Sequence, residues 1–358
     1  MGLHGHGGEK ALSCQQTEHF TVDNYVDEKT WQEYVEKAAH ILRAEELVAF
    51  PTETVYGLGA NGLSTRAVQK IFKAKGRPSD NPLILHIGSL TQLYSLIRAP
   101  LSFHAEKLIE HFWPGPLTLI FPASDRVPRV VTAGLDTVAV RMPAHRLARA
   151  IIAKADVPIA APSANRSGKP SPTRAEHVRE DLDGRVAAII DGGSTGYGLE
   201  STVVDVSDGE RSPRILRPGG VTKEEMEEAL GVSMAAEGRE RRKNNVRAPG
   251  MKYRHYSPDT NVKLVDGSCA DMQARIDEAR NRGERVAAAI TSDRMGKISA
   301  DEVLILGDAS DLQGISTHLY DHLRAVDKMD VNVLFMQTFA ETGLGKAIMN
   351  RLHKAAHS

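Results

Sequence analysis

Cysteine is almost absent from this sequence of 358 residues, in which only Cys14 and Cys269 occur. Two distant cysteines cannot build a thiolate metal site, and no H-E-x-x-H segment or other zinc-ligand spacing is present, so we expect no metal-binding residues. Cys14 falls in residues 1–28, which begin Gly- and His-rich and which we predict to be a disordered tail; a structural disulfide is therefore not expected. Such sparse cysteine suits a reducing compartment, and we expect a cytoplasmic protein.

Long apolar runs and an excess of basic charge are also missing. No run reaches about 18 apolar residues, and residues 1–8 lack the apolar core of a signal peptide, so we expect no membrane attachment. The formal net charge is −1, whereas proteins that grip RNA over a long footprint usually carry a basic excess. We therefore expect any link to RNA to depend on a small-molecule product or a partner protein, without tight direct binding.

The familiar nucleotide-binding motifs are absent or out of place. Residues 343–347 (GLGKA) have neither the spacing nor the hydroxyl group of a P-loop. Residues 57–62 fit G-x-G-x-x-G, but residues 51–56 separate them from the preceding apolar segment, and no acidic residue ends the next one. These glycines are better explained by a tight loop than by a dinucleotide site.

Two α/β patterns follow one another along the chain. Helical spacing alternates with short apolar segments over residues 29–230, which predicts an α/β domain with a mixed sheet. The periodicity disappears over residues 231–260, a stretch first charged and then rich in Pro, Tyr and His, which predicts a linker. A second alternation over residues 261–358 predicts a smaller parallel α/β domain.

Basic, hydroxyl and amide side chains stand at predicted strand and helix ends in the first domain. A polyphosphate needs such groups, because Lys and Arg neutralise its charge and hydroxyl groups donate hydrogen bonds. Each residue alone also has a structural explanation: a lysine can favour a helix C-terminus, Ser and Asn can form turns, and an arginine can form an ion pair. The candidates are Lys75, Arg77, Arg141, Ser163, Asn165, Ser201 and Arg217.

Four segments are more specific when taken together. They are Pro51-Thr-Glu-Thr-Val-Tyr-Gly-Leu58, Lys75-x-Arg77, Ser163-x-Asn165 and Ser201-Thr-Val-Val-Asp205. In this order they closely resemble the YrdC-domain family of threonylcarbamoyl-AMP synthases over about residues 30–230. Residues 249–258 (PGMKYRHYSP) and the domain after them resemble the longer, two-domain branch of that family. The resemblance implies a YrdC-like domain with a twisted mixed sheet and a concave active-site face, followed by a Rossmann-like parallel α/β domain.

The resemblance also implies an activity and residue roles. The implied enzyme is an L-threonylcarbamoyladenylate synthase, which forms threonylcarbamoyl-AMP and pyrophosphate from L-threonine, bicarbonate or CO2, and ATP, for N6-threonylcarbamoyladenosine modification of tRNA. Lys75 and Arg77 are the implied catalytic residues. The implied nucleotide site is Lys75, Arg77, Ser163, Asn165, Ser201 and Arg217. The implied threonine site is Thr52, His86, Thr118 and Arg141. The implied lid is Tyr253, His255 and Tyr256, the alternative being a plain linker with aromatic residues packed between domains.

Three further expectations follow from that resemblance. Mg²⁺ is expected as the cofactor, held mainly through ATP phosphates and water, because the leaving pyrophosphate is highly charged. The product is expected to pass to a tRNA threonylcarbamoyl-transferase complex. Two alternatives stay open: an RNA-binding module without catalysis, and a carbamoyl-adenylating domain of hydrogenase maturation, whose zinc-finger and acylphosphatase-like modules have no counterpart in this sequence.

Overall fold

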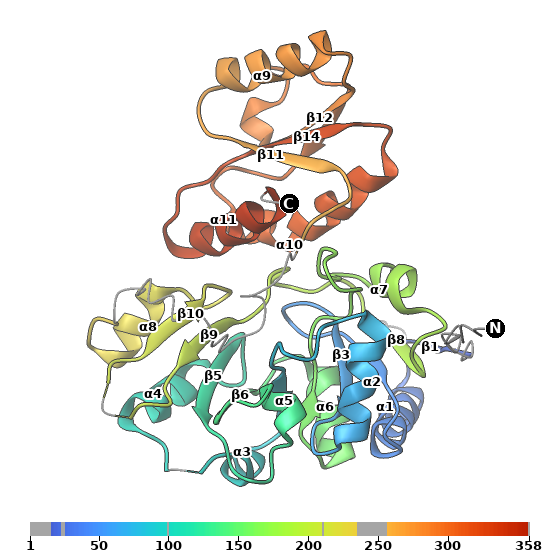
Figure 1. The fold of residues 1–358 in the computed structure, drawn as a ribbon, viewed down its shortest axis with the longest axis vertical. Coiled ribbons are helices and arrows are strands. Elements are labelled where there is room, and N and C mark those ends of the chain that lie inside the picture. The colour runs from blue at the N-terminus through green and yellow to red at the C-terminus, as the bar shows by residue number, and fades with distance from the viewer. Residues whose placement is uncertain (1–15, 23–25, 99, 210, 235–255, 357–358) are drawn as a thin grey trace, which may run out of the picture.

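The computed structural model describes residues 16–22, 26–98, 100–209, 211–234 and 256–356, which form two sheets with their helices (Figure 1). The larger sheet has ten strands in the order β1-β8-β2-β3-β7-β4-β6-β5-β9-β10. Its strands are β1 (Glu18–Thr21), β2 (Val48–Phe50), β3 (Gly57–Asn61), β4 (Ile84–His86), β5 (Leu117–Pro122), β6 (Thr137–Arg141), β7 (Ile159–Ala160), β8 (Ala188–Asp191), β9 (Thr202–Asp205) and β10 (Arg214–Arg217). The sheet contains parallel pairs such as β4 with β6 and antiparallel pairs such as β5 with β6, so it is mixed as predicted.

Helices cover both faces of this sheet because successive strand residues point to opposite sides. Val48 and Phe50 pack in the cluster formed with α1 and α6, whereas Ala49 between them belongs to the larger cluster on the other face. The helices are α1 (Glu28–Arg43), α2 (Thr65–Lys75), α3 (Leu90–Leu96), α4 (Phe103–Phe112), α5 (Arg129–Thr132), α6 (Arg146–Ala155), α7 (Ala175–Leu182) and α8 (Lys223–Leu230).

The prediction of a disordered tail over residues 1–28 is wrong for its C-terminal part. Residues 18–21 form β1, which pairs in parallel with β8 at one edge of the sheet. Phe20 is buried there and stacks on Tyr34 of α1, with ring centroids 5.0 Å apart. One aromatic residue in a short polar stretch was too weak a periodic signal to predict this strand.

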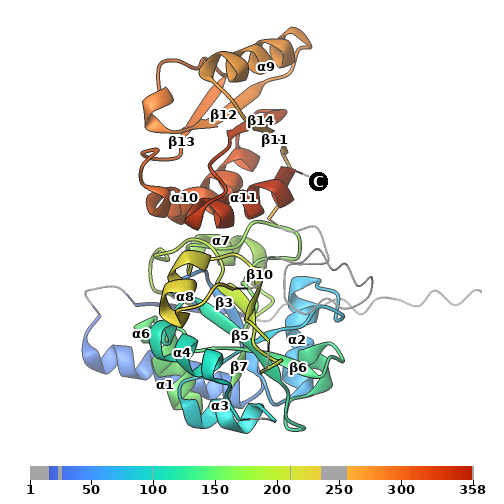
Figure 2. The same cartoon turned by 90° about the vertical axis from the view of Figure 1, so that its left-hand side faces the viewer.

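The smaller sheet has four parallel strands in the order β11-β14-β12-β13, which confirms the predicted second α/β unit. Its elements are β11 (Asn261–Val265), α9 (Cys269–Asn281), β12 (Val286–Ile290), η1 (Ser292–Arg294), β13 (Glu302–Ile305), α10 (Leu312–Ala325), η2 (Val326–Lys328), β14 (Val333–Gln337) and α11 (Gly343–Ala356). Helix α9 covers the outer face, while α10 and α11 lie between this sheet and the first domain (Figure 2).

The two halves share apolar contacts. Val55 and Leu199, from loops of the first half, lie in one buried cluster with Leu319 and Ile348 from α10 and α11. Most of the predicted linker, residues 235–255, falls outside the described residues. Within the described part of the chain, no helix is long and apolar enough to span a bilayer.

Candidate active site

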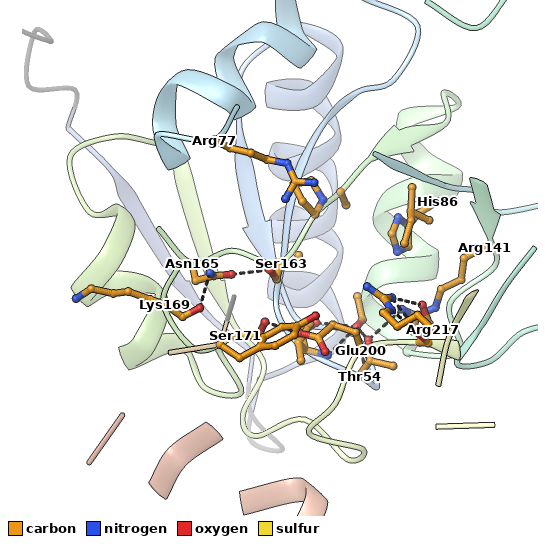
Figure 3. Close-up of a pocket in the computed structure, with 18 residues that line it drawn as sticks. Thr54, Arg77, His86, Arg141, Ser163, Asn165, Lys169, Ser171, Glu200 and Arg217 are labelled. Carbon is orange, nitrogen blue, oxygen red and sulfur yellow. Dashed lines mark hydrogen bonds between the residues drawn. The ribbon is translucent and has the colours of Figure 1, made fainter. Parts of the chain in front are cut away.

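A cavity of about 650 Å³ that is open to solvent gathers most of the predicted site residues (Figure 3). Its walls come from loops and strand ends of the first half, with Tyr256 from the segment before β11. The lining residues are Thr52, Thr54, Val55, Gly57, Arg77, Ile84, His86, Arg141, Ala161, Pro162, Ser163, Asn165, Lys169, Ser171, Glu200, Ser201, Arg217 and Tyr256.

Arg141 is fixed in one corner of the cavity by neighbouring loops. Its Nε donates to the carbonyl of Gly115 (3.1 Å), and its Nη1 donates to Oγ1 of Thr54 (2.9 Å). Its Nη2 lies 2.6 Å from Oε1 of Glu53 and forms an ion pair with that carboxylate. The guanidinium also lines the cavity, and a fork of N–H groups is well suited to recognise a ligand carboxylate.

Glu53 is the counter-ion of Arg141 and was not among the predicted site residues. Burial alone would raise the pKa of its carboxyl group, but the positive charge of Arg141 outweighs burial and lowers that pKa. An unpaired charge at this depth would be strongly destabilising, so the ion pair makes the buried arginine possible. The signal that could have identified Glu53 as a site residue was its position between two threonines in residues 51–58.

His86 lies next to Arg141 because the two strands that carry them are paired in parallel, with His86 opposite Arg141. Burial, and then the nearby charge of Arg141, lower the pKa of His86 to about 3, so its imidazole is neutral at physiological pH. Its Nδ1 is buried and has no hydrogen-bond partner among the described residues. The side chain can therefore exchange one neutral hydrogen bond with a ligand.

We predict that His86 makes the fold less stable in acid. Below pH 6.5 the unfolded chain protonates this histidine, whereas the folded chain resists protonation down to a pKa of about 3. The stability is thus complete above pH 6.5 and falls as the pH decreases toward 3. When the pH is lowered from 6.5 to 4.5, the free energy of unfolding should decrease in both proteins. The decrease should be about 2–3 kcal/mol smaller in His86→Asn than in the unsubstituted protein.

Urea unfolding followed by tryptophan fluorescence at these two pH values measures the difference. His40→Asn is the matched control, because His40 is exposed on α1. Equal losses in the unsubstituted protein and in His86→Asn would show that His86 does not stay neutral in the folded state.

Lys75 and Arg77 flank the C-terminus of α2, which ends where Gly76 adopts a left-handed conformation with φ of 62°. Glycine adopts such an angle without strain, so the chain reverses here and sends the two side chains in different directions. Arg77 lines the cavity. Lys75 does not: its Nζ donates to the backbone carbonyls of Ser163 and Asn165 from beneath their loop. Burial, followed by the charge of Arg77, holds the pKa of Lys75 well below its usual value.

The loop above Lys75 is closed by its own side chains. Ser163 donates to Oδ1 of Asn165 (2.5 Å), and Nδ2 of Asn165 donates to the carbonyls of Arg166 (2.8 Å) and Lys169 (2.9 Å). These bonds turn the chain so that Lys169 and Ser171 also line the cavity. Figure 3 shows Asn165 and Lys169 on the opposite side from His86 and Arg141.

Ser201 and Arg217 form the third part of the wall. Arg217 donates through Nε (3.1 Å) and Nη2 (2.9 Å) to the carbonyl of Ser201, and through Nη2 to its hydroxyl group (3.1 Å). Thr118 lies behind this pair, where its hydroxyl group is 2.7 Å from that of Ser201. It does not line the cavity, so the structure places it as a support for Ser201 and not in direct reach of a ligand.

Of the predicted lid, Tyr253 and His255 lie outside the described residues. Tyr256 is buried and lines the cavity while stacking on Tyr320 of α10, with ring centroids 5.5 Å apart. Its φ of 66° is rare for a residue with a side chain, so the contacts on both sides of the ring hold a strained backbone. Tyr256 therefore packs between the domains and also forms part of the site.

Metal ligands were not predicted from the sequence. In the described ranges, no group of three or more His, Cys, Asp or Glu side chains could hold a metal ion. Glu200 is the one carboxylate that lines the cavity among the described residues, and it is bonded to Arg351 through Nε (3.0 Å).

A cavity with Arg77, Lys169 and Arg217 among its walls, and with a buried arginine beside a neutral imidazole, suits a phosphorylated nucleotide bound next to a small carboxylate ligand. On this mixed α/β sheet, it defines the class of nucleotide-using transferases.

Comparison with known proteins identifies the family. Residues 40–219 match the family model described as Telomere recombination (Sua5, YciO and YrdC), and residues 221–357 match the threonylcarbamoyl-AMP synthase C-terminal domain. The threonylcarbamoyl-AMP synthase of Bacillus subtilis is 48% identical over 342 residues, which cover 95% of this chain and 98% of that protein. The Pyrococcus abyssi enzyme is 49% identical over 322 residues, covering 89% and 93%.

A crystal structure of Pyrococcus abyssi Sua5 complexed with L-threonine matches with a TM-score of 0.87 at 46% identity, covering 95% of this chain and 98% of the other. The chain belongs to the threonylcarbamoyl-AMP synthase family. It is accordingly an enzyme of the nucleotidyltransferase type.

Proposed function

We propose that this cavity joins L-threonine, bicarbonate or CO2, and ATP into threonylcarbamoyl-AMP and pyrophosphate, for modification of an adenosine in tRNA. The observation that carries the proposal is one continuous cavity in which Arg141 and His86 share walls with Arg77, Asn165 and Arg217. Binding of L-threonine to the Pyrococcus abyssi relative, which matches over nearly the whole chain, supports threonine as the amino-acid substrate.

The threonine carboxylate would pair with Arg141, whose guanidinium lines the cavity. Neutral His86 and the threonine hydroxyl groups of the 52–54 turn would meet the polar groups of the substrate. On the other side, Ser163 and Asn165 would bind the nucleotide, with Lys75 supporting their loop, while Arg77 and Arg217 would place positive charge around its phosphates.

The reaction would proceed in two steps. The neutral amine of threonine adds to the carbon of CO2 and loses a proton, which gives a carbamate. A carbamate oxygen then attacks the α-phosphorus of ATP, the bond from that phosphorus to the bridging oxygen breaks, and pyrophosphate leaves. No covalent bond to the enzyme is needed, so these residues would act by positioning the reactants and neutralising charge.

Mg²⁺ belongs to this proposal as a cofactor. The cationic walls and the already bonded Glu200 offer no cluster of free carboxylates, which fits an ion held through phosphate oxygens and water. When bound, it would neutralise charge on the leaving pyrophosphate. Transfer of the product to a tRNA threonylcarbamoyl-transferase complex, and a cytoplasmic location, are parts of the same proposal and rest on the family resemblance.

Pyrophosphate release tests the proposal directly. The protein is incubated with ATP and Mg²⁺, and L-threonine and bicarbonate are omitted in turn. We expect release only when both are present, because the carbamate is the nucleophile. Arg77→Ala should slow the release by about a hundredfold, the usual order for removing a cation from a phosphate site. Release from folded protein that does not depend on threonine would contradict the assigned reaction.

A further inference from the structure

A buried carboxylate links the two domains directly behind the cavity. Glu200 precedes Ser201 and is 7% exposed. It accepts hydrogen bonds from Ser171 (2.5 Å), from the hydroxyl group of Tyr320 on α10 (3.0 Å) and from Nε of Arg351 on α11 (3.0 Å). Burial alone would raise the pKa of Glu200, but the charges of Arg351 and Arg217 outweigh it and lower that pKa to about 2.

The guanidinium of Arg351, which is fully buried, holds two segments of the first domain at once. Its Nη1 donates to the carbonyl of Pro218, and its Nη2 donates to the carbonyl of Glu200 (3.3 Å). Pro218 directly follows Arg217, and Glu200 directly precedes Ser201. One side chain of the C-terminal domain thus fixes the backbone beside both Ser201 and Arg217.

Residues 217–219 and residues 200–202 are also packed closely against each other. A Cβ atom at Gly219 would lie 2.3 Å from the backbone nitrogen of Thr202 and 2.4 Å from the carbonyl oxygen of Glu200. Because backbone meets backbone here, a shift of residues 217–219 would displace residues 200–202 with them. The hydrogen bonds from Arg217 to Ser201 depend on this contact.

Helix α10 holds two other stretches of the cavity wall. Ser316 donates to the carbonyl of Tyr197 (2.8 Å), which leads into Glu200. Arg324 donates to the carbonyl of Pro170 (2.6 Å), between Lys169 and Ser171, and to Asp181 (2.7 Å). The contact with Pro170 ends on backbone between two residues that line the cavity, Lys169 and Ser171.

Stability alone does not explain a buried charge pair at this place. Well-packed apolar residues of similar volume are commonly as stabilising as a buried ion pair, whereas the ion pair imposes a defined geometry on its partners. That geometry is imposed here on the residues next to Ser201 and Arg217.

We propose that Arg351 and Tyr320 are positioning residues, through which the C-terminal domain sets Ser201 and Arg217 against the phosphates of the nucleotide. They act through Glu200 and Pro218 and do not touch the substrates. The inference rests on the proposed function for the identity of the ligand, ATP. Loss of either residue should therefore weaken nucleotide binding and leave threonine binding intact, because Arg141 is held by Glu53, Thr54 and Gly115.

Two binding constants measured on the full chain test this proposal. Calorimetry gives the Kd of an α,β-methylene analogue of ATP with Mg²⁺ and, separately, the Kd of L-threonine. We expect Arg351→Met to weaken binding of the analogue by about tenfold or more, since charged hydrogen bonds are lost, and Tyr320→Phe by about twofold to fivefold. Arg351→Lys keeps the charge and should recover part of the loss.

Arg285→Met is the matched control, because Arg285 is a half-exposed arginine of the same domain that pairs with exposed Asp330. It should bind both ligands like the unsubstituted protein. Unchanged binding of the analogue in a folded Arg351→Met protein would overturn the proposal, and so would equal weakening for both ligands, which indicates a general structural defect.

If Arg351→Met does not fold, Tyr320→Phe decides the question. It keeps the ring stacked on Tyr256 and removes only the hydroxyl group bonded to Glu200. An unchanged Kd for the analogue in this variant would then overturn the proposal. Failure of the proposed function would be recognised by a different result. The unsubstituted protein would bind both ligands but release no threonine-dependent pyrophosphate.

Discussion

Replacing Arg141 by alanine should lower kcat/KM for threonine by about a thousandfold, which corresponds to about 4 kcal/mol. The guanidinium is buried and lines the cavity, where it would meet the carboxylate of threonine. Truncating one member of a buried hydrogen-bonded charge pair costs about 2–5 kcal/mol, partly because the partner charge stays behind. Here both the substrate carboxylate and Glu53 would lose their cation.

Titrating threonine at saturating ATP and following pyrophosphate measures this loss. Arg141→Lys should recover little activity, because a single ammonium group cannot replace a fork that also bonds to Gly115 and Thr54. Arg129→Ala is the control, since that arginine is 75% exposed in its pair with Asp136. Binding of the ATP analogue should survive in Arg141→Ala. A change of less than about tenfold in the KM for threonine would place the carboxylate elsewhere.

Short-range signals in the sequence predicted the local structure well. Thr222 and Glu225 form a capping box at the start of α8, and such a motif can be found in a sequence because it depends on residues three positions apart. The alternation of apolar segments also predicted the four parallel strands of the second domain. The strand β1 was missed because its burial depends on α1 and β8, and no periodicity in so short a segment shows these partners.

The candidate site was predicted from motifs. A motif does not show whether a side chain faces the cavity or lies behind the cavity wall. Lys75 and Thr118 lie behind the cavity wall because each supports a loop whose shape is decided by residues far along the chain. Glu200 was not predicted for the same reason: its partner Arg351 is 151 positions away on a helix of another domain. Contacts at such separation depend on how the two domains dock.

The family motif implies that Lys75 binds the nucleotide, whereas the structure places it behind the cavity wall. We expect a large effect on activity when this residue is replaced as well. Lys75→Met should lower kcat/KM for ATP by about a hundredfold, because two buried carbonyls lose their donor at about 1–3 kcal/mol each. The carbonyls are those of Ser163 and Asn165, so the loop that carries both residues would lose its shape. Lys70→Met is the control on the same helix, since Lys70 pairs with Glu46 at the surface.

The charge of Lys75 gives a second, independent readout. Burial and the nearby charge of Arg77 hold its pKa well below the usual value in the ligand-free protein. An ATP phosphate placed close by would raise that pKa again, since a nearby anion favours the charged amine. At a pH above the lowered pKa of Lys75, nucleotide binding should then take up protons from the buffer, and Lys75→Met should reduce this uptake. Calorimetry in buffers of different ionisation enthalpy measures it. Equal proton uptake and equal nucleotide affinity in both proteins would mean that Lys75 neither shapes the loop nor lies close to the phosphates. Equal proton uptake with a lower nucleotide affinity in Lys75→Met would mean that Lys75 is only a structural support for the loop.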